Sequence, residues 1–147
     1  MATIFFDMDG TLADFYGVEN WLEYLNAENT LPYEVAKPLH NMQALAHRLN
    51  NLQRKGYKLE ILSWTSKTGS DFFNDEIATA KLKWLASHFA SVNFDAITII
   101  PYGIRKDNFR HEADDILFDD EERNRKDWQG FAFDTDDIFK ILGVLGK

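Results

Sequence analysis

Uninterrupted apolar runs that lead into acidic or hydroxyl residues are the feature that most limits how this chain can fold. The first run, Ile4 to Phe6, shows no polar alternation and leads directly into Asp7 and Asp9. A run of this kind is typical of a parallel strand that is covered on both faces. We therefore expect residues 3–6 to form a buried central strand with the two carboxylates at its C-terminal end.

Extended and helical patterns alternate along the rest of the chain. Four further strands are predicted, over residues 57–62, 96–100, 115–118 and 130–133. Apolar spacing of three and four residues predicts helices over residues 42–52 with Gly56 as a stop, from Ser70 or Asp71 to Ala90, after Glu121, and over 136–144. Such alternation implies right-handed crossovers, so the expected fold is of the α/β class: a three-layer α/β/α, Rossmann-like sandwich on a mainly parallel five-stranded sheet.

One segment, residues 15–38, departs from this alternation. It is rich in aromatic residues, carries two prolines, and lies between the first strand and the first regular helix. We expect it to form a small helical cap over the strand ends. A chain of 147 residues with 45% hydrophobic content suits one compact core. The expected organisation is thus a single domain over residues 1–147, with 15–38 as a cap insert.

Composition excludes several classes of protein. The chain has no cysteine, which rules out disulfides, thiolate metal sites and cysteine nucleophiles. A net charge of −8 argues against binding long nucleic acids, but it conceals local cations that could hold a small anion. The N-terminal region lacks a basic segment and its apolar run ends at Asp7, so neither a signal peptide nor a membrane span is expected and the default location is cytoplasmic. The oligomeric state is left open.

Polar residues follow three of the predicted strands at the same relative place. These residues are Asp7 after the first strand, Ser63 after the second, and Asp119 with Asp120 after the fourth. The C-terminal ends of parallel strands form the ligand crevice of an open sheet, so we expect these side chains to converge. Carboxylates gathered at one edge repel one another unless a positive group lies among them.

A hard divalent ion is the natural partner for such carboxylates. Mg²⁺ suits a site with few carboxylates that is completed by water and a substrate phosphate. One carboxylate could then act as a nucleophile on phosphorus. A second, two residues further along an extended chain, would point the same way and could protonate the leaving oxygen.

The order of these motifs resembles the haloacid dehalogenase-like phosphohydrolases. The motifs are Asp7-Met8-Asp9-Gly10-Thr11, then Ser63, then a lysine, then Asp119-Asp120, and together they cover nearly the whole chain. The resemblance implies that Asp7 is the nucleophile that forms an aspartyl-phosphate. It implies that Asp9 is the general acid and then the general base, and lends its backbone carbonyl to Mg²⁺. Ser63 would hold a phosphoryl oxygen, and Asp119 and Asp120 would complete the metal site.

The basic residue of the third motif has more than one candidate. Lys106 is favoured because the family uses a lysine there, as a compact point charge that can bridge the phosphate and the nucleophile. Arg105 is adjacent to it, and Lys67 is the fallback because it follows Ser63 by only four residues. Arg105, Lys67 and Thr65 are expected among the substrate-binding residues.

Residues 6–15 further resemble the start of the 5′(3′)-deoxyribonucleotidase branch, where the phenylalanine at the position of Phe15 lines a base-binding pocket. The aromatic residues of the cap are consistent with stacking a nucleobase, and equally with packing of the cap itself. Residues 63–67 differ from the Thr-Ser-Pro usual in that branch, and the cap is shorter.

The expected function is that of a Mg²⁺-dependent phosphomonoesterase acting on a small phosphorylated substrate, with a (deoxy)nucleoside monophosphate as the first choice. Another phosphate ester, or phosphate binding without catalysis, are the alternatives. A phospho-receiver domain is excluded because it would place its acidic pair early in the chain.

Overall fold

The computed structural model describes all residues, 1–147, and contains one five-stranded sheet in which every pairing is parallel. The strands are β1 (Thr3–Phe6), β2 (Lys58–Trp64), β3 (Ala96–Ile100), β4 (Ile116–Phe118) and β5 (Phe131–Phe133). Their order is β3-β2-β1-β4-β5, so the chain winds outward from β1 in one direction and then returns to continue on its other side. The prediction of an α/β fold on five strands is confirmed.

Six α-helices and three short 3₁₀ segments connect the strands. They are η1 (Phe15–Gly17), α1 (Trp21–Asn26), α2 (Leu31–Val35), α3 (Met42–Arg54), α4 (Asp71–His88), η2 (Lys106–Phe109), α5 (Glu122–Asp127), η3 (Thr135–Asp137) and α6 (Ile138–Leu145). Ser70 caps α4, because its hydroxyl accepts a hydrogen bond from the backbone of Phe73. None of the helices combines the length and the apolar character that crossing a bilayer requires.

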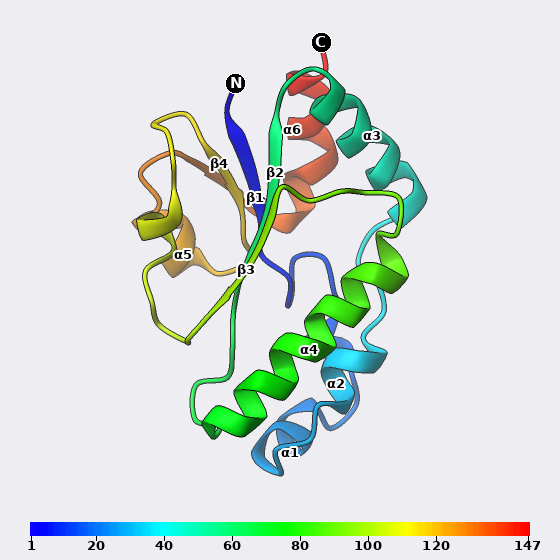
Figure 1. The fold of residues 1–147 in the computed structure, drawn as a ribbon, viewed down its shortest axis with the longest axis vertical. Coiled ribbons are helices and arrows are strands. Elements are labelled where there is room, and N and C mark those ends of the chain that lie inside the picture. Colours follow the sequence, from blue (N-terminus) through cyan, green and yellow to red (C-terminus); the bar gives the residue numbers. More distant parts are fainter.

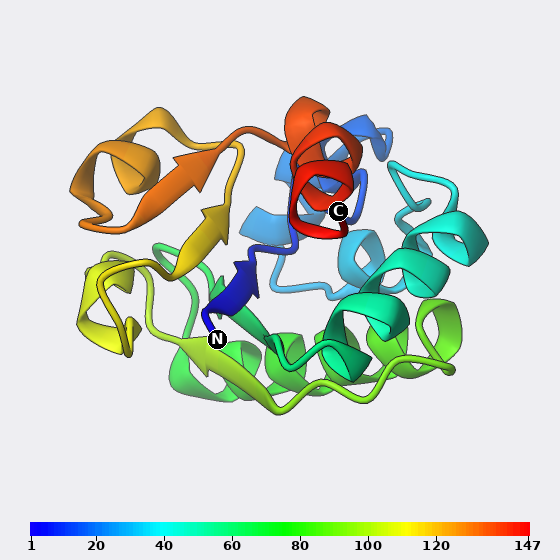
Figure 2. The same cartoon turned by 90° about the horizontal axis from the view of Figure 1, so that it is seen from above.

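The two faces of the sheet are covered unequally. Ile4 and Phe6 of β1 face a large apolar cluster that α3, α4 and α6 complete. Phe5 faces the other side, where Trp128 and Phe109, next to α5 and η2, complete a smaller cluster. The views in Figure 1 and Figure 2 show α5 on the side of the sheet away from α3 and α6. The sheet is thus flanked by helices, with a thin layer on one face.

Strand β2 is longer than the sequence pattern predicts. It continues through Ser63 and Trp64, which pair with Ile99 and Ile100 of β3. The sequence pattern predicts that the strand ends at residue 62, because the apolar run stops at the polar residue Ser63. The neighbouring strand extends the pairing, so Ser63 is held rigidly within β2.

The segment 15–38 contains η1, α1 and α2 and packs against the first half of α4 (Figure 1). Phe15 and Tyr33 form an apolar cluster with that half of the helix. The Glu28 carboxylate accepts hydrogen bonds from the backbone N–H and the hydroxyl of Ser70, at 3.1 and 2.6 Å, and so joins the segment to the N-terminus of α4. Helix α4 therefore supports both the sheet and the inserted segment.

Candidate active site

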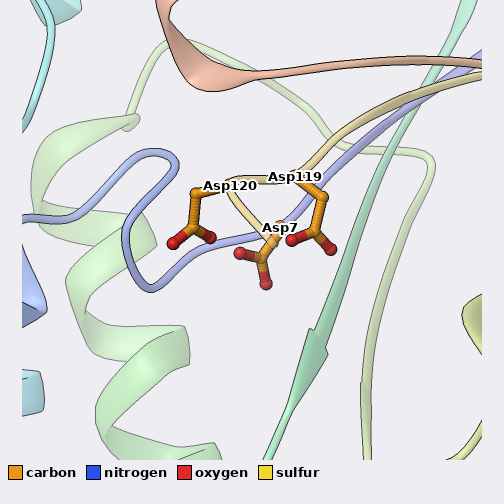
Figure 3. Close-up of side chains that lie close together, drawn as sticks. All are labelled: Asp7, Asp119 and Asp120. Atoms are coloured by element: carbon orange, nitrogen blue, oxygen red, sulfur yellow. The ribbon is translucent and has the colours of Figure 1, made fainter. Parts of the chain in front are cut away.

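The pairing of β1 with β4 brings three aspartates together at the C-terminal edge of the sheet. The backbone N–H of Asp7 donates to the carbonyl oxygen of Phe118, at 2.9 Å, so β4 delivers Asp119 and Asp120 beside Asp7. One oxygen from each of the three carboxylates lies within 4.8 Å of the others. Figure 3 shows the three side chains turned toward one another from the ends of two strands. The sequence prediction that these residues converge agrees with this geometry.

The turn after Asp7 needs glycine at position 10. Gly10 has a φ of +81°, and a Cβ there would lie 2.2 Å from Oδ2 of Asp120. The turn is closed by the Met8 carbonyl, which accepts from the backbone N–H groups of three residues that follow Gly10. Only a residue without a side chain lets the Asp120 carboxylate approach so closely.

Thr11 joins the first and fourth motifs. Its hydroxyl lies 3.0 Å from Oδ2 of Asp7 and 3.3 Å from Oδ1 of Asp120, and its proton can be donated to either. The same oxygen accepts from the backbone N–H of Asp120 at 3.1 Å. Thr11 is completely buried and so fixes the relative position of the two carboxylates.

Lys106 is the cation between the carboxylates. Its Nζ lies 2.9 Å from Oδ1 of Asp7 and 2.7 Å from Oδ2 of Asp119, and the side chain is 2% exposed. Burial acts to lower the pKa of Lys106, but Asp7 and Asp119 raise it by more, so the net direction is upward. The ammonium therefore stays charged. Of the candidates for the third motif, Lys106 is the one beside Asp7.

Asp119 and Asp120 differ in how well their oxygens are satisfied. Asp119 accepts from Lys106, from Nδ2 of Asn124 at 3.0 Å and from the backbone of Glu121 at 2.9 Å. Asp120 has only the shared hydroxyl of Thr11. Burial, together with the charge of Asp7, raises the pKa of Asp119 to about 6 and that of Asp120 to about 8.

This donor set fits a hard divalent cation. Three carboxylates face the single charge of Lys106, which leaves an excess of negative charge in a buried place. Burial raises the pKa values of Asp119 and Asp120, and the neighbouring negative charge of Asp7 raises them further. Oxygen ligands on a partly open, acidic site are what Mg²⁺ prefers. The cluster could therefore bind a metal ion.

Asp9 contacts a lysine that sequence reasoning missed. Oδ2 of Asp9 lies 3.0 Å from Nζ of Lys81, which projects from the middle of α4 and is 1% exposed. Lys81 also donates to the hydroxyl of Ser63 and to the carbonyl of Trp64, at 2.6 Å each. Burial raises the pKa of Asp9 and Lys81 opposes the rise. Asp9 thus turns away from the other aspartates, toward α4.

Of the two residues that sequence reasoning missed, Lys81 and Asn124, only Lys81 carries a signal in the sequence. Lys81 lies four residues after Ile77 and three before Trp84, on the face of the helix that the apolar pattern assigns to the core. A lysine at such a position requires a buried anionic or polar partner. Asn124 carries no comparable signal, because its role depends on the turn that follows Asp120.

A pocket of about 190 Å³ opens beside Asp7, Asp9, Ser63 and Lys106. Six aromatic side chains contribute to its wall: Phe15, Tyr16, Trp21, Tyr33, Trp64 and Tyr102. Thr65 and Lys67, two of the candidate substrate-binding residues, also line it.

Phe15 and Arg105 differ from expectation. Phe15 reaches the pocket but is only 3% exposed and packs on Tyr33, with ring centroids 4.6 Å apart, so it belongs mainly to the core of the cap. Arg105 does not line the pocket. Its guanidinium donates to the carbonyl of Asp127, at 2.9 Å, because the turn into η2 directs Lys106 inward and its neighbour outward.

Comparison with known proteins supports the fold. The chain is similar in structure to D,D-heptose 1,7-bisphosphate phosphatase from Burkholderia thailandensis, with a TM-score of 0.51 and 14% identity over 99% of this chain and 74% of that one. The likeness is one of fold, and in this chain that fold is a parallel sheet flanked by helices, as in a Rossmann-like domain. No protein-family model matches the chain, and no curated protein sequence matches it.

Proposed function

We propose that this protein is a phosphomonoesterase that works through an aspartyl-phosphate on Asp7. The observation that carries the proposal is the position of Lys106, buried between Asp7 and Asp119 at the mouth of a pocket that also contains Asp9 and Ser63. Lys106 contacts Oδ1 of Asp7 and leaves Oδ2 without a cation, so Oδ2 is the oxygen that would attack phosphorus. The structural similarity to a bisphosphate phosphatase agrees with this chemistry.

The first step transfers the phosphoryl group to the protein. A carboxylate oxygen of Asp7 attacks phosphorus, and the bond from phosphorus to the ester oxygen breaks. The bonding electrons leave with the ester oxygen, which takes a proton from Asp9. In the second step Asp9 removes a proton from a water molecule, which attacks the phosphorus of the acyl phosphate and restores the Asp7 carboxylate.

Charged and polar groups around the pocket would stabilise the transferring group. Lys106 would neutralise one of its oxygens. Ser63 accepts a hydrogen bond from Lys81, so its own proton remains available for a phosphoryl oxygen. Thr65 and Lys67 line the same pocket and would contact the rest of the substrate.

The metal ligands would be Asp7, Asp120, the backbone carbonyl of Asp9, and Asp119. Bound Mg²⁺ would supply positive charge that offsets repulsion between the carboxylates and the phosphate. Asp120 is the strongest candidate for direct contact, because Asp119 already accepts three hydrogen bonds from the protein.

Lys81 would position Asp9 for its exchange of protons. The ammonium holds one carboxylate oxygen of Asp9 at 3.0 Å, which leaves the other to face the leaving oxygen. It also links Asp9 to Ser63, so the proton donor and the phosphate-binding hydroxyl keep a fixed relation.

We propose a nucleoside monophosphate as the first substrate class, because aromatic side chains line the pocket. Tyr16 and Trp21 present aromatic surface next to Asp9, and stacking on a base contributes about 1–3 kcal/mol. A volume of about 190 Å³ is small for this purpose, since ligand pockets usually enclose about 300–1,000 Å³. A whole nucleotide therefore requires the cap segment to move away from α4. A smaller phosphate ester would not require that motion.

The test is phosphate release from a panel of substrates, each with Mg²⁺ and with a chelator. The panel contains 5′- and 3′-(deoxy)nucleoside monophosphates, sugar phosphates and an aryl phosphate. We expect nucleotides to be hydrolysed fastest and the chelator to stop hydrolysis. If only the aryl phosphate is hydrolysed, the proposed mechanism is supported, but a nucleotide is rejected as the substrate. No turnover of any ester with Mg²⁺ present would contradict the proposed function itself.

A further inference from the structure

Positive charge is segregated in this acidic chain. Of its 24 acidic residues, none falls within residues 35–59 or 138–147. These two segments nevertheless contain seven of the 16 lysines and arginines: Lys37, Arg48, Arg54, Lys55, Lys58, Lys140 and Lys147. Although the net charge of the chain is −8, these two segments carry basic side chains and no acidic ones.

The fold brings the two segments side by side. Helices α3 and α6 lie next to each other in both views of the molecule (Figure 1, Figure 2). Between them is a groove of about 600 Å³, three times the volume of the pocket beside Asp7. Four cations line it, and no aspartate or glutamate does: Arg48, Arg54, Lys55 and Lys147.

These cations have no acidic partner. No carboxylate lies within 4.0 Å of any of the four charged groups. Arg54 donates to the side chain of Asn51, and Lys55 to the carbonyl of Gly146. Both contacts hold a cation at the groove without neutralising it, so an anion that entered would meet uncompensated charge.

The helix dipole explains only part of this arrangement. Arg54 and Lys55 lie at the C-terminal end of α3, where cations are favourable. Arg48 lies in the middle of that helix, with its guanidinium 5.8 Å from the ring of Phe139. A Cβ at Gly143, inside α6, would lie 3.2 Å from Nη1 of Arg48. A glycine inside a helix is destabilising relative to alanine, and here it leaves room around the guanidinium.

The spacing of the cations selects the ligand. Arg48 and Arg54 are six residues apart on one helix, which places them about 9 Å apart along its axis. A ligand that carries negative charge along its length can therefore meet cations at both ends of the groove. We propose that the groove between α3 and α6 binds a small ligand that carries two or three linked phosphate groups. Its volume of about 600 Å³ lies within the usual range for ligand sites.

This groove is separate from the site of the proposed function. Helix α3 ends just before β2 begins, so Arg54 lies toward the N-terminal edge of the sheet. Asp7 and Asp119 lie at the opposite, C-terminal edge. The inference does not depend on the protein being a phosphatase, and its test needs no turnover.

The experiment is a titration of the full chain with inorganic tripolyphosphate at low ionic strength, without divalent ions, by calorimetry and by amide chemical shifts. We expect saturable binding of one tripolyphosphate, with the largest shifts at Asn51, Gly143 and Gly146. Arg48→Gln and Arg54→Gln should each weaken binding about fivefold or more, which corresponds to roughly 1 kcal/mol. Orthophosphate should bind far more weakly.

Lys140→Gln is the matched control. Lys140 is exposed on α6, the other helix that borders the groove, and does not line the groove, so its loss removes the same charge from the same region. The proposal is overturned if this variant weakens binding as much as Arg48→Gln, because the attraction would then be diffuse. Shifts confined to the surroundings of Asp7 would also overturn it, as would orthophosphate binding equally well. If an oligonucleotide binds and tripolyphosphate does not, the proposal of a small ligand is wrong and the groove binds a nucleic acid strand instead.

Discussion

Two buried lysines divide the carboxylates of the site between them. Lys106 contacts Asp7 and Asp119, and Lys81 contacts Asp9. Asp120 alone lacks a cation, and it has the carboxylate whose pKa burial raises to about 8. Because metal ligation favours the ionised carboxylate, Asp120 gains most from an ion. We expect its replacement to weaken metal binding strongly.

Replacement of Asp7, the proposed nucleophile, should lower activity without lowering the stability of the fold. Asp7→Asn should lower kcat by about 10³-fold or more, because the amide cannot form the acyl phosphate. The variant removes one of three mutually repelling charges, so the melting temperature measured in chelator should not fall. Steady-state kinetics and thermal unfolding check both expectations. Retention of full activity would show that another residue attacks phosphorus.

Replacing Lys81 should affect substrates according to their leaving group. An alkyl phosphate needs a proton on its leaving oxygen, and general acid catalysis contributes about 10²–10⁴-fold. A nitrophenyl phosphate needs little such help. In Lys81→Met we therefore expect kcat to fall about 10²-fold or more for the alkyl ester and much less for the aryl ester.

The control for Lys81→Met is Asp9→Asn, alone and combined with it. If Lys81 acts through Asp9, the double variant should be little worse than Asp9→Asn. Equal loss on both classes of ester would instead indicate a role of Lys81 in the structure of β2 and α4.

The sequence indicates which types of residue form the candidate site, but it does not show which of two adjacent residues, such as Arg105 and Lys106, faces the site. Asp7, Asp9, Asp119 and Asp120 could be identified because each follows an apolar run. Lys106 could not be separated from Arg105 by spacing, since the turn into η2 decides which of the two faces inward. Lys81 could not be assigned because its partners come from other elements.

Among the elements, α4 has the most connections. Its first half packs on the cap, its middle carries Lys81, and its second half packs on the sheet. Movement of the cap away from α4 would disturb the helix that holds Asp9 through Lys81. Motion of the cap and proton transfer are therefore expected to be coupled through α4.

The aromatic surface of the cap can be tested at Tyr16. This residue is 48% exposed and lines the pocket, whereas Phe15 is buried and its removal would damage the cap itself. If a base stacks there, Tyr16→Ala should raise KM for a nucleoside monophosphate about 5- to 100-fold, from roughly 1–3 kcal/mol of stacking. KM for ribose 5-phosphate should hardly change.

A matched control for Tyr16→Ala is Phe72→Ala. Phe72 is 74% exposed on α4 and does not line the pocket. Equal changes in KM for the nucleotide and the sugar phosphate would contradict the proposal that the nucleobase stacks on Tyr16.

The order and type of the elements could be predicted because apolar periodicity reports burial directly. All five strands were found this way, and the ends differ by at most two residues. The extension of β2 through Trp64 depends on pairing with β3, which local sequence does not encode. The helix after Glu121 could be predicted, but the thinness of the layer that it forms with η2 could not, since it follows from how these segments pack on Phe5 and Leu117.

For the whole molecule, stability should depend on pH and metal together. The pKa values of Asp119 and Asp120, about 6 and about 8, lie above the roughly 3.9 of an exposed aspartate. The folded state thus binds protons more tightly than the unfolded chain. In chelator, the unfolding free energy should fall as the pH rises from about 4 to 8. Mg²⁺ should reverse that fall, because it stabilises the ionised carboxylates.

Thermal unfolding at pH 5.5 and pH 8.5, with and without Mg²⁺, measures this dependence. In a domain of this size each kcal/mol shifts the melting temperature by roughly 2–4 °C. Asp120→Asn should flatten the dependence seen in chelator. Equal melting temperatures at the two pH values in chelator would contradict the raised pKa values.

The strand order β3-β2-β1-β4-β5 implies that the candidate site forms late during synthesis and folding. The central strand β1 is synthesised first, yet its neighbour β4 emerges more than a hundred residues later. Until then Asp7 has neither Lys106, 99 residues away, nor the acidic pair beside it. A nascent chain that stops before residue 120 carries the proposed nucleophile but not the complete cluster of three aspartates. Mg²⁺ should therefore act only on the last phase of folding.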